Sequence, residues 1–126
     1  MQPPDATAPL FKILEPDAWE AAADVLPWAP IDRSDGFVHL SAAHQVRETA
    51  RIHFAGREAL VLVEVLPEHL APGTLRWEAS RGGALFPHVY ADVPRAALGR
   101  VARFSTLPGA PFPDHLVPPA PTDREA

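Results

Sequence analysis

The chain has 126 residues, a net charge of -5, no cysteine and 47% hydrophobic residues. This length supports one hydrophobic core and is too short for two domains of ordinary size. The lack of cysteine excludes disulfides, thiolate nucleophiles and cysteine-ligated zinc, and the acidic balance disfavours a surface built for long nucleic acid. No apolar run reaches the roughly eighteen residues of a membrane helix, and the N-terminus lacks a signal-peptide pattern, so we expect a cytoplasmic protein without membrane contact.

Proline interrupts both ends of the chain and favours extended, unpaired backbone there. Residues 1–9 are also poor in apolar side chains, which leaves little surface to bury. We therefore predict a disordered N-terminal tail over 1–9, a single globular domain over 10–107 and a Pro-rich mobile tail over 108–126.

The first half of the predicted domain combines short strands with two helices. Weak alternation predicts a strand that ends before Pro16, and Asp17 is placed to cap the helix that follows. The Asp35-Gly36 pair predicts a turn, and Ser41 is placed to cap a second helix. The predicted elements are a strand over 10–14, a helix over 17–24, a loop over 26–32, a strand over 37–40 and a helix over 42–54.

The second half reads mainly as strands. The run over 59–66 is the most apolar in the chain and rich in β-branched residues, which predicts an internal strand with most side chains buried. Further strands are predicted over 75–78, 85–90 and 100–104, with a short helical turn opened by Asp92 and Pro94. Because strands and helices do not alternate steadily, the fold class is predicted to be α+β.

His39 is a polar residue in the middle of an apolar strand. Alternation places it on the side opposite Val38 and Leu40, together with Ser41 at the start of the next helix. Two interpretations remain open. His39 is either a buried structural histidine bonded to a backbone carbonyl, or a ligand contact in a donor-rich corner formed with Ser41 and the helix N-terminus. Gln45, in the first turn of that helix, either extends this corner or is solvated.

A carboxylate, a second imidazole and several aromatic side chains lie close together in the last third of the predicted domain. Trp77 beside Glu78 would exclude water and raise the pKa of that carboxyl group, which suits acid or base work; a solvated glutamate opposite an arginine is the structural alternative. Pro87 predicts an edge or opening, which puts His88 and Tyr90 on one face of an accessible rim. The aromatic rings are either a stacking surface for a planar ligand or part of the core.

Two other chemistries are less consistent with the sequence. His39, His88 and Glu78 form a familiar ligand set for zinc or iron, but no closely spaced histidine motif accompanies them, so no metal is expected. A serine hydrolase is disfavoured because the Gly-x-Ser-x-Gly elbow is absent. We therefore treat His39, Glu78 and His88 as candidate catalytic residues that converge on one cleft.

Several stretches together carry a resemblance to a known family. They are Lys12-Ile13-Leu14 followed by Trp19, the run from Asp35 to Ser41 with Gln45, Leu75-Arg76-Trp77-Glu78, and Phe86-Pro87-His88-Val89-Tyr90. This set spans about Leu10 to Phe104 and resembles domain of unknown function 952, a family of small bacterial proteins. The run from Val38 to Ser41 is also similar to a motif of the RNA 2'-phosphotransferases, although their anchoring arginine cluster has no match here.

The resemblance implies an ADP-ribosyltransferase-like fold, a split curved sheet with two main helices whose cleft holds NAD in active members. Lys12 stands at the strand position that is often histidine in NAD-using relatives, and Ala91 stands where the family usually has glycine. The residues and the resemblance together give an expected ligand-binding set of Lys12, Ser41, Gln45, Trp77, Arg81, Phe86 and Tyr90.

Two classes of function follow from these observations. In the first, the protein binds NAD or a related nucleotide and transfers or hydrolyses ADP-ribose, with Glu78 or His88 as the charge-stabilising or acid–base group. In the second, the same pocket is a non-catalytic binding module for a small metabolite. Both classes imply a small, nucleotide-like partner, and the sequence leaves the oligomeric state undetermined.

Overall fold

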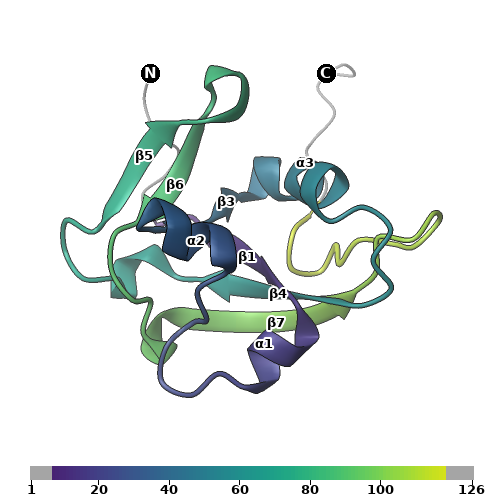
Figure 1. Cartoon of the computed structure of the whole chain (residues 1–126), viewed down its shortest axis with the longest axis horizontal. Helices are drawn as coiled ribbons and strands as arrows, with labels where there is room; N and C mark the ends of the chain where they lie inside the picture. The colour runs from purple at the N-terminus through teal and green to yellow at the C-terminus, as the bar shows by residue number, and fades with distance from the viewer. Residues whose placement is uncertain (1–6, 119–126) are drawn as a thin grey trace.

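Antiparallel strands and a few short helices make up the fold, which a computed structural model describes for residues 7–118 (Figure 1). The predictions for residues 1–6 and 119–126 lie outside the described residues. In chain order the elements are β1 Leu10–Leu14, α1 Pro16–Glu20, α2 Pro30–Asp35, β2 Val38–His39, β3 Ser41–Ala42, α3 Ala43–His53, β4 Leu60–Val65, η1 Pro67–His69, β5 Leu75–Ala79, η2 Arg81–Gly83, β6 Leu85–Val89, η3 Arg95–Ala97 and β7 Leu98–Phe104. Within the described part of the chain, no helix has the length and apolar character needed to span a bilayer.

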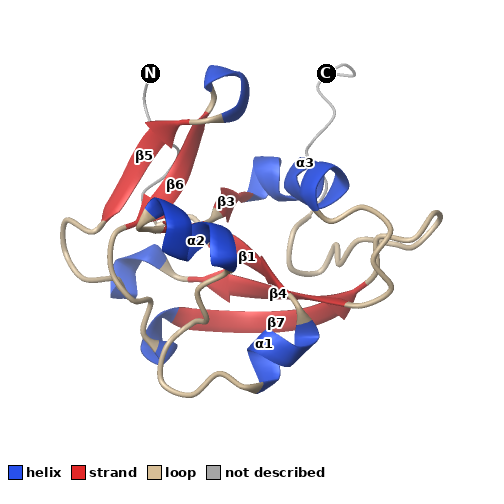
Figure 2. Cartoon of the chain, viewed as in Figure 1, coloured by secondary structure: helices blue, strands red, loops and turns tan. Residues whose placement is uncertain are grey.

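The larger sheet has four strands in the order β3-β1-β4-β7, all antiparallel (Figure 2). Every side chain of β4 is buried, because this strand lies between β1 and β7 and carries core on both faces. The internal strand predicted over 59–66 is therefore confirmed. β3 is only two residues long and pairs with β1 at Leu10 and Phe11 alone, so the rest of that side of β1 has no strand beside it in the described sheet.

The smaller sheet has three strands in the order β2-β6-β5, and β5 and β6 form the long hairpin at the upper left of Figure 1. Its strands alternate as predicted: Val38, Leu75 and Val89 face the core, so their neighbours along each strand face the other side. In the β2–β6 register His39 lies directly opposite His88. The two histidines therefore share the face of the small sheet that points away from the core.

Two apolar clusters cover the two faces of the large sheet. One joins it to the small sheet through Leu14, Val63, Val38 and Val89. The other packs it against α3, where Val46 and Ala50 are buried, as the predicted helical stripe requires. The large sheet is thus the middle layer of the described domain, with α3 on one side and the small sheet on the other.

Three predicted elements differ in the structure. The first helix is one short turn and a half, ending at Glu20 rather than near residue 24. The stretch predicted as a loop over 26–32 contains the start of α2, Pro30–Asp35, and the C-cap Gly36 ends this helix in a left-handed conformation with φ 88°. Ser41 does not cap the second helix: it lies in β3, and the carboxamide of Gln45 instead accepts the backbone N–H of Ala42 at 3.0 Å. Gln45 is the third residue of α3, so this contact is the half of a capping box in which the N3 side chain accepts the N–H of the N-cap residue.

Residues 108–118, the described part of the predicted mobile tail over 108–126, pack on the domain, in contrast to the prediction. Leu116 and Val117 are buried in the cluster beneath α3. Arg47 of α3 donates hydrogen bonds to the carbonyl of Val117 and to Asp114, and its guanidinium lies over the ring of Phe112. Prolines prevented regular structure here, as expected, but the apolar side chains between them still cover one face of the core.

Candidate functional site

A cleft of about 650 Å³ opens along the side of β1 that β3 leaves uncovered. Residues of α2 form one wall, residues of α3 form another, and the outer face of the small sheet closes a third. Its apolar lining includes Phe11, Trp28, Ile31 and Phe86, and its polar lining includes His39 and His88. The volume and the mixture of apolar walls with a few polar groups are typical of small-molecule sites.

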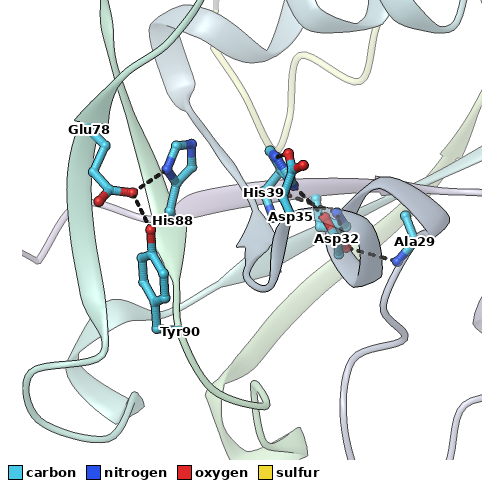
Figure 3. Close-up of polar contacts among 8 residues, drawn as sticks. Ala29, Asp32, Asp35, His39, Glu78, His88 and Tyr90 are labelled. Carbon is cyan, nitrogen blue, oxygen red and sulfur yellow. Dashed lines mark hydrogen bonds and ion pairs between the residues drawn. The ribbon is translucent and has the colours of Figure 1, made fainter.

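His39 lies between two carboxylates of α2, as Figure 3 shows. Its Nδ1 is 2.7 Å from Asp32 Oδ1, and its Nε2 is 3.0 Å from Asp35 Oδ2. Both nitrogens donate at once only when the ring carries both protons. Asp32 is fully buried and Asp35 is exposed at the cleft, so the two carboxylates present very different surroundings to one imidazole.

Lys12 connects β1 to Asp32 and His39. Its ammonium donates to Asp32 Oδ2 at 2.8 Å and to the backbone carbonyl of His39 at 3.0 Å. Burial lowers the pKa of Lys12, although the charge and hydrogen bond of Asp32 oppose that change. Lys12, predicted as a ligand-binding residue, lines the cleft, but its two hydrogen bonds, to Asp32 and to the His39 carbonyl, are made within the protein.

The second imidazole has a carboxylate of its own. His88 Nδ1 is 2.7 Å from Glu78 Oε1, and the hydroxyl of Tyr90 donates to the same oxygen at 2.8 Å (Figure 3). The hydrogen bonds from His88 and then Tyr90 lower the pKa of Glu78. The predicted increase in the Glu78 pKa is therefore wrong, because Trp77 points to the opposite face of β5 and packs against the core.

Phe37 organises the outer face of the small sheet. Its ring stacks on His88 with centroids 4.2 Å apart and contacts His39 and Tyr90 at 4.5 and 4.9 Å. The rings of His39 and His88 are 5.3 Å apart in an edge arrangement. This packing restricts the rotation of both imidazoles, so each ring is fixed by a carboxylate at Nδ1 and by an aromatic neighbour.

The structure brings together some of the predicted site residues and separates others. The cleft is lined by His39, His88, Ser41, Phe86 and Lys12. Glu78 and Tyr90 do not line it: Glu78 of β5 contacts His88, Tyr90 donates to Glu78, and the guanidinium of Arg76 lies over the Tyr90 ring. Glu78 is therefore placed to orient His88 rather than to touch a ligand in the cleft.

Gln45 and Trp77 have structural roles that the ligand-binding prediction did not foresee. The Gln45 carboxamide donates to the carbonyl of Leu85 at 2.6 Å while accepting from Ala42, so it ties α3 to the hairpin. Trp77 belongs to the core side of β5. Arg81 begins η2, and its side chain lies outside what the structure describes. No group of three or more metal-ligating side chains suited to an ion occurs within residues 7–118 as described.

Sequence reasoning missed Asp32, Asp35 and Phe37 as parts of the site. Asp35 and Phe37 lie in the turn that was recognised, but the turn was interpreted only as chain geometry. The signal for Asp32 was its place two residues after Pro30, because proline at the first helical position followed by an acidic residue is typical of a helix start. A helix there would have directed Asp32 and His39 toward each other.

A family model and solved structures of one other protein match this chain. Residues 13–101 match the family described as "Protein of unknown function (DUF952)". The chain belongs to this family. Its fold is similar to the crystal structure of protein CC0527 from Caulobacter crescentus, with a TM-score of 0.77, 39% sequence identity and coverage of 86% of this chain and 98% of that one. The solution structure of the same protein gives a TM-score of 0.72 at 38% identity, covering 87% of this chain and 97% of that one. No curated protein matches the sequence.

Proposed function

We propose that this protein binds NAD or a related nucleotide in the cleft beside β1 and transfers or hydrolyses ADP-ribose there. The observation that carries the proposal is the pair of histidines on one cleft wall, each with a carboxylate oxygen 2.7 Å from its Nδ1. A carboxylate at Nδ1 leaves Nε2 as the nitrogen that exchanges protons with a bound molecule. The resemblance to ADP-ribosyltransferase-like proteins supplies the choice of NAD over other planar ligands.

The apolar lining supports a planar, heterocyclic ligand. Trp28 and Phe86, which are half-buried, offer surfaces on which an aromatic ring can stack, and the volume of about 650 Å³ lies within the range of about 300–1,000 Å³ typical of ligand sites. Ser41 provides a hydroxyl at the inner end, where it lies 3.1 Å from the Thr49 hydroxyl. A hydroxyl pair of this kind suits a ribose or carboxamide group.

In the hydrolytic form of the reaction, the bond between the ribose carbon and the nicotinamide nitrogen breaks, and its electron pair neutralises the pyridinium ring. Water forms the new bond to that carbon and gives up one proton. Two carboxylates, Glu15 and Asp35, line the cleft, and Glu15 is paired with the guanidinium of Arg57 at 2.5 Å. In this scheme we therefore assign to Asp35 the stabilisation of the positive charge that develops on the ribose. His88, oriented by Glu78, is placed to take the proton from water. Glu78, the original candidate for charge stabilisation, acts through His88 in this scheme.

A non-catalytic binding module for a small metabolite is the second candidate function. The observation that favours it is the extent to which polar groups of the site bond to one another, because Lys12, Asp32 and His39 form a closed set of contacts. Such a set gives a rigid binding surface without requiring a reaction.

Incubation of the pure protein with NAD distinguishes the two candidates. Free nicotinamide is measured by chromatography and binding by calorimetry, for the wild type and for His39→Ala and His88→Ala. His69→Ala is the matched control, since His69 is exposed in η1 and away from the cleft. Release that both cleft variants abolish supports the enzyme, and binding without release supports the module. If NAD neither binds nor reacts, the proposal is wrong.

A further inference from the structure

A lysine is buried on the apolar face of β1. Lys12 alternates with Leu10 and Leu14, which belong to the core cluster between the sheets, and only 5% of its surface is exposed. An ammonium group in such a place is destabilising unless it is paired and fully hydrogen-bonded. The only acidic side chain that it contacts within the described residues is Asp32, which has no exposed surface. Because a buried ion pair is often no more stabilising than apolar side chains of the same size, we consider a role of this pair other than stability.

Asp32 accepts hydrogen bonds from several groups at once. Oδ1 accepts from the backbone N–H of His39 at 3.0 Å and lies 2.7 Å from its Nδ1. Oδ2 accepts from Lys12 at 2.8 Å and from the N–H of Ala29, at the start of α2, at 2.8 Å. The carboxylate is thereby fixed by β1 and α2, and it holds both the backbone and the ring of His39.

The charge state of Asp32 decides which ring nitrogen of His39 holds a proton. Burial favours the neutral acid, but the hydrogen bond from His39 and the charge of Lys12 outweigh it and lower the pKa of Asp32 to about 2. An ionised carboxylate only accepts hydrogen bonds, so Nδ1 of His39 must donate. The other groups around the ring are Asp35 at Nε2, the ring of His88 and the ring of Phe37. None of these contacts Nδ1.

We propose that Lys12 and Asp32 are positioning residues that keep a proton on Nδ1 of His39, so that Nε2, beside Asp35 at the cleft, is the nitrogen that exchanges a proton with the ligand. The role of Nε2 toward a ligand rests on the proposed function, whereas the protonation of Nδ1 does not. Lys12 acts by supplying the buried positive charge that keeps Asp32 ionised. It also holds the His39 carbonyl, which fixes β2 against β1 across the gap between the sheets.

Nitrogen NMR of the histidine rings tests this inference without any ligand. In the neutral ring, the protonated and the unprotonated nitrogen have well separated ¹⁵N shifts, and the His39 signals are identified by their absence from His39→Ala. At alkaline pH the wild type is expected to show neutral His39 with its proton on Nδ1. A wild-type ring protonated on Nε2 overturns the inference outright.

Variants separate positioning from a general structural role. In Lys12→Met/Asp32→Leu the buried pair is replaced by apolar side chains of similar size, and the Nδ1-protonated signal is expected to be lost, with Nε2 now protonated toward Asp35. Asp35→Asn is the matched control: it removes the charge at Nε2 and should leave the proton on Nδ1. If the double variant folds and keeps the Nδ1 proton, Lys12 and Asp32 do not set it. If the double variant fails to fold, the wild-type and Asp35→Asn spectra still test the inference, because a neutral His39 protonated on Nε2 in either protein overturns it.

A binding measurement connects the inference to the proposed function. The double variant is expected to lose NAD affinity to the same extent as His39→Ala. If His39→Ala binds NAD as well as the wild type does, the proposed function fails while the tautomer result stands. If His39→Ala loses binding and the folded double variant does not, the positioning role fails while the proposed function stands.

Discussion

The ionised state of Asp32 makes a specific contribution to stability that should disappear in acid. The pKa of Asp32 in the folded protein is about 2, against an ordinary value of 3.8. A carboxyl group with a depressed folded pKa binds protons more readily in the unfolded chain, so its contribution is present above pH 3.8 and is lost as the pH falls through about 2. At about 1.4 kcal/mol per pH unit, the difference between those values corresponds to about 2.5 kcal/mol of unfolding free energy.

The variant Lys12→Met/Asp32→Asn isolates this contribution. Asparagine keeps the shape and one acceptor for the start of α2 but cannot ionise, and methionine removes the charge that would otherwise remain buried and unpaired. Urea unfolding followed by circular dichroism gives the free energy at a series of pH values from about 5 to about 2. Other carboxyl groups with lowered pKa values, such as Glu64 and Glu78, affect both proteins alike.

The expected result is a wild-type curve that falls more steeply in acid than the curve of the variant, by about 2 kcal/mol between about pH 5 and about pH 2, because the rest of the contribution is lost below the folded pKa of about 2. Parallel curves would contradict the conclusion that Asp32 is held ionised by Lys12 and His39.

Three further predictions test other parts of the structure. Leu116→Ala should lower the free energy of unfolding by about 2–5 kcal/mol, because Leu116 is buried in the core, whereas the matched change at half-exposed Leu107 should cost much less; equal small losses would place the C-terminal segment off the core. Gly99→Ala should destabilise by about 1–3 kcal/mol, since a Cβ there would lie 2.4 Å from the buried Glu64 Oε1, and an unchanged urea midpoint would contradict that contact. His39→Ala should weaken NAD binding by about 1–3 kcal/mol without unfolding the domain, and calorimetry that gives the wild-type Kd would contradict its role in the site.

The strands could be predicted from the sequence because their signals are local. The bounds of β1 follow from alternation and from Pro16, and β4 follows from an apolar run that only an internal strand accommodates. For His39 and His88, the sequence predicted only that both residues line one cleft, and it did not predict that they lie opposite each other on paired strands. Their register depends on how β2 and β6, far apart in the sequence, meet at the small sheet.

The parts that were missed depend on long-range contacts. Leu116 and Val117 lie among prolines, whose local effect suggested a mobile tail. Their burial depends on the apolar cluster that they share with Val46 of α3 and with β4, which lies far away in the sequence. From the sequence alone, Lys12 is a polar residue in a predicted strand, with no local sign that it is buried. Its role appears only when α2 brings Asp32 to the same point, which no pattern around Lys12 indicates.

The histidine rings themselves offer the most direct measurement of whether a nucleotide occupies the cleft. The chain has six histidines, and three of them, His39, His53 and His88, line the cleft. The remaining histidines, His44, His69 and His115, do not line it and serve as internal controls. When NAD is titrated into the protein and the ring signals are followed by NMR, the account predicts saturable shifts at the first set and unchanged signals at the second. Saturable shifts confined to the second set, or no shifts at all, would contradict it.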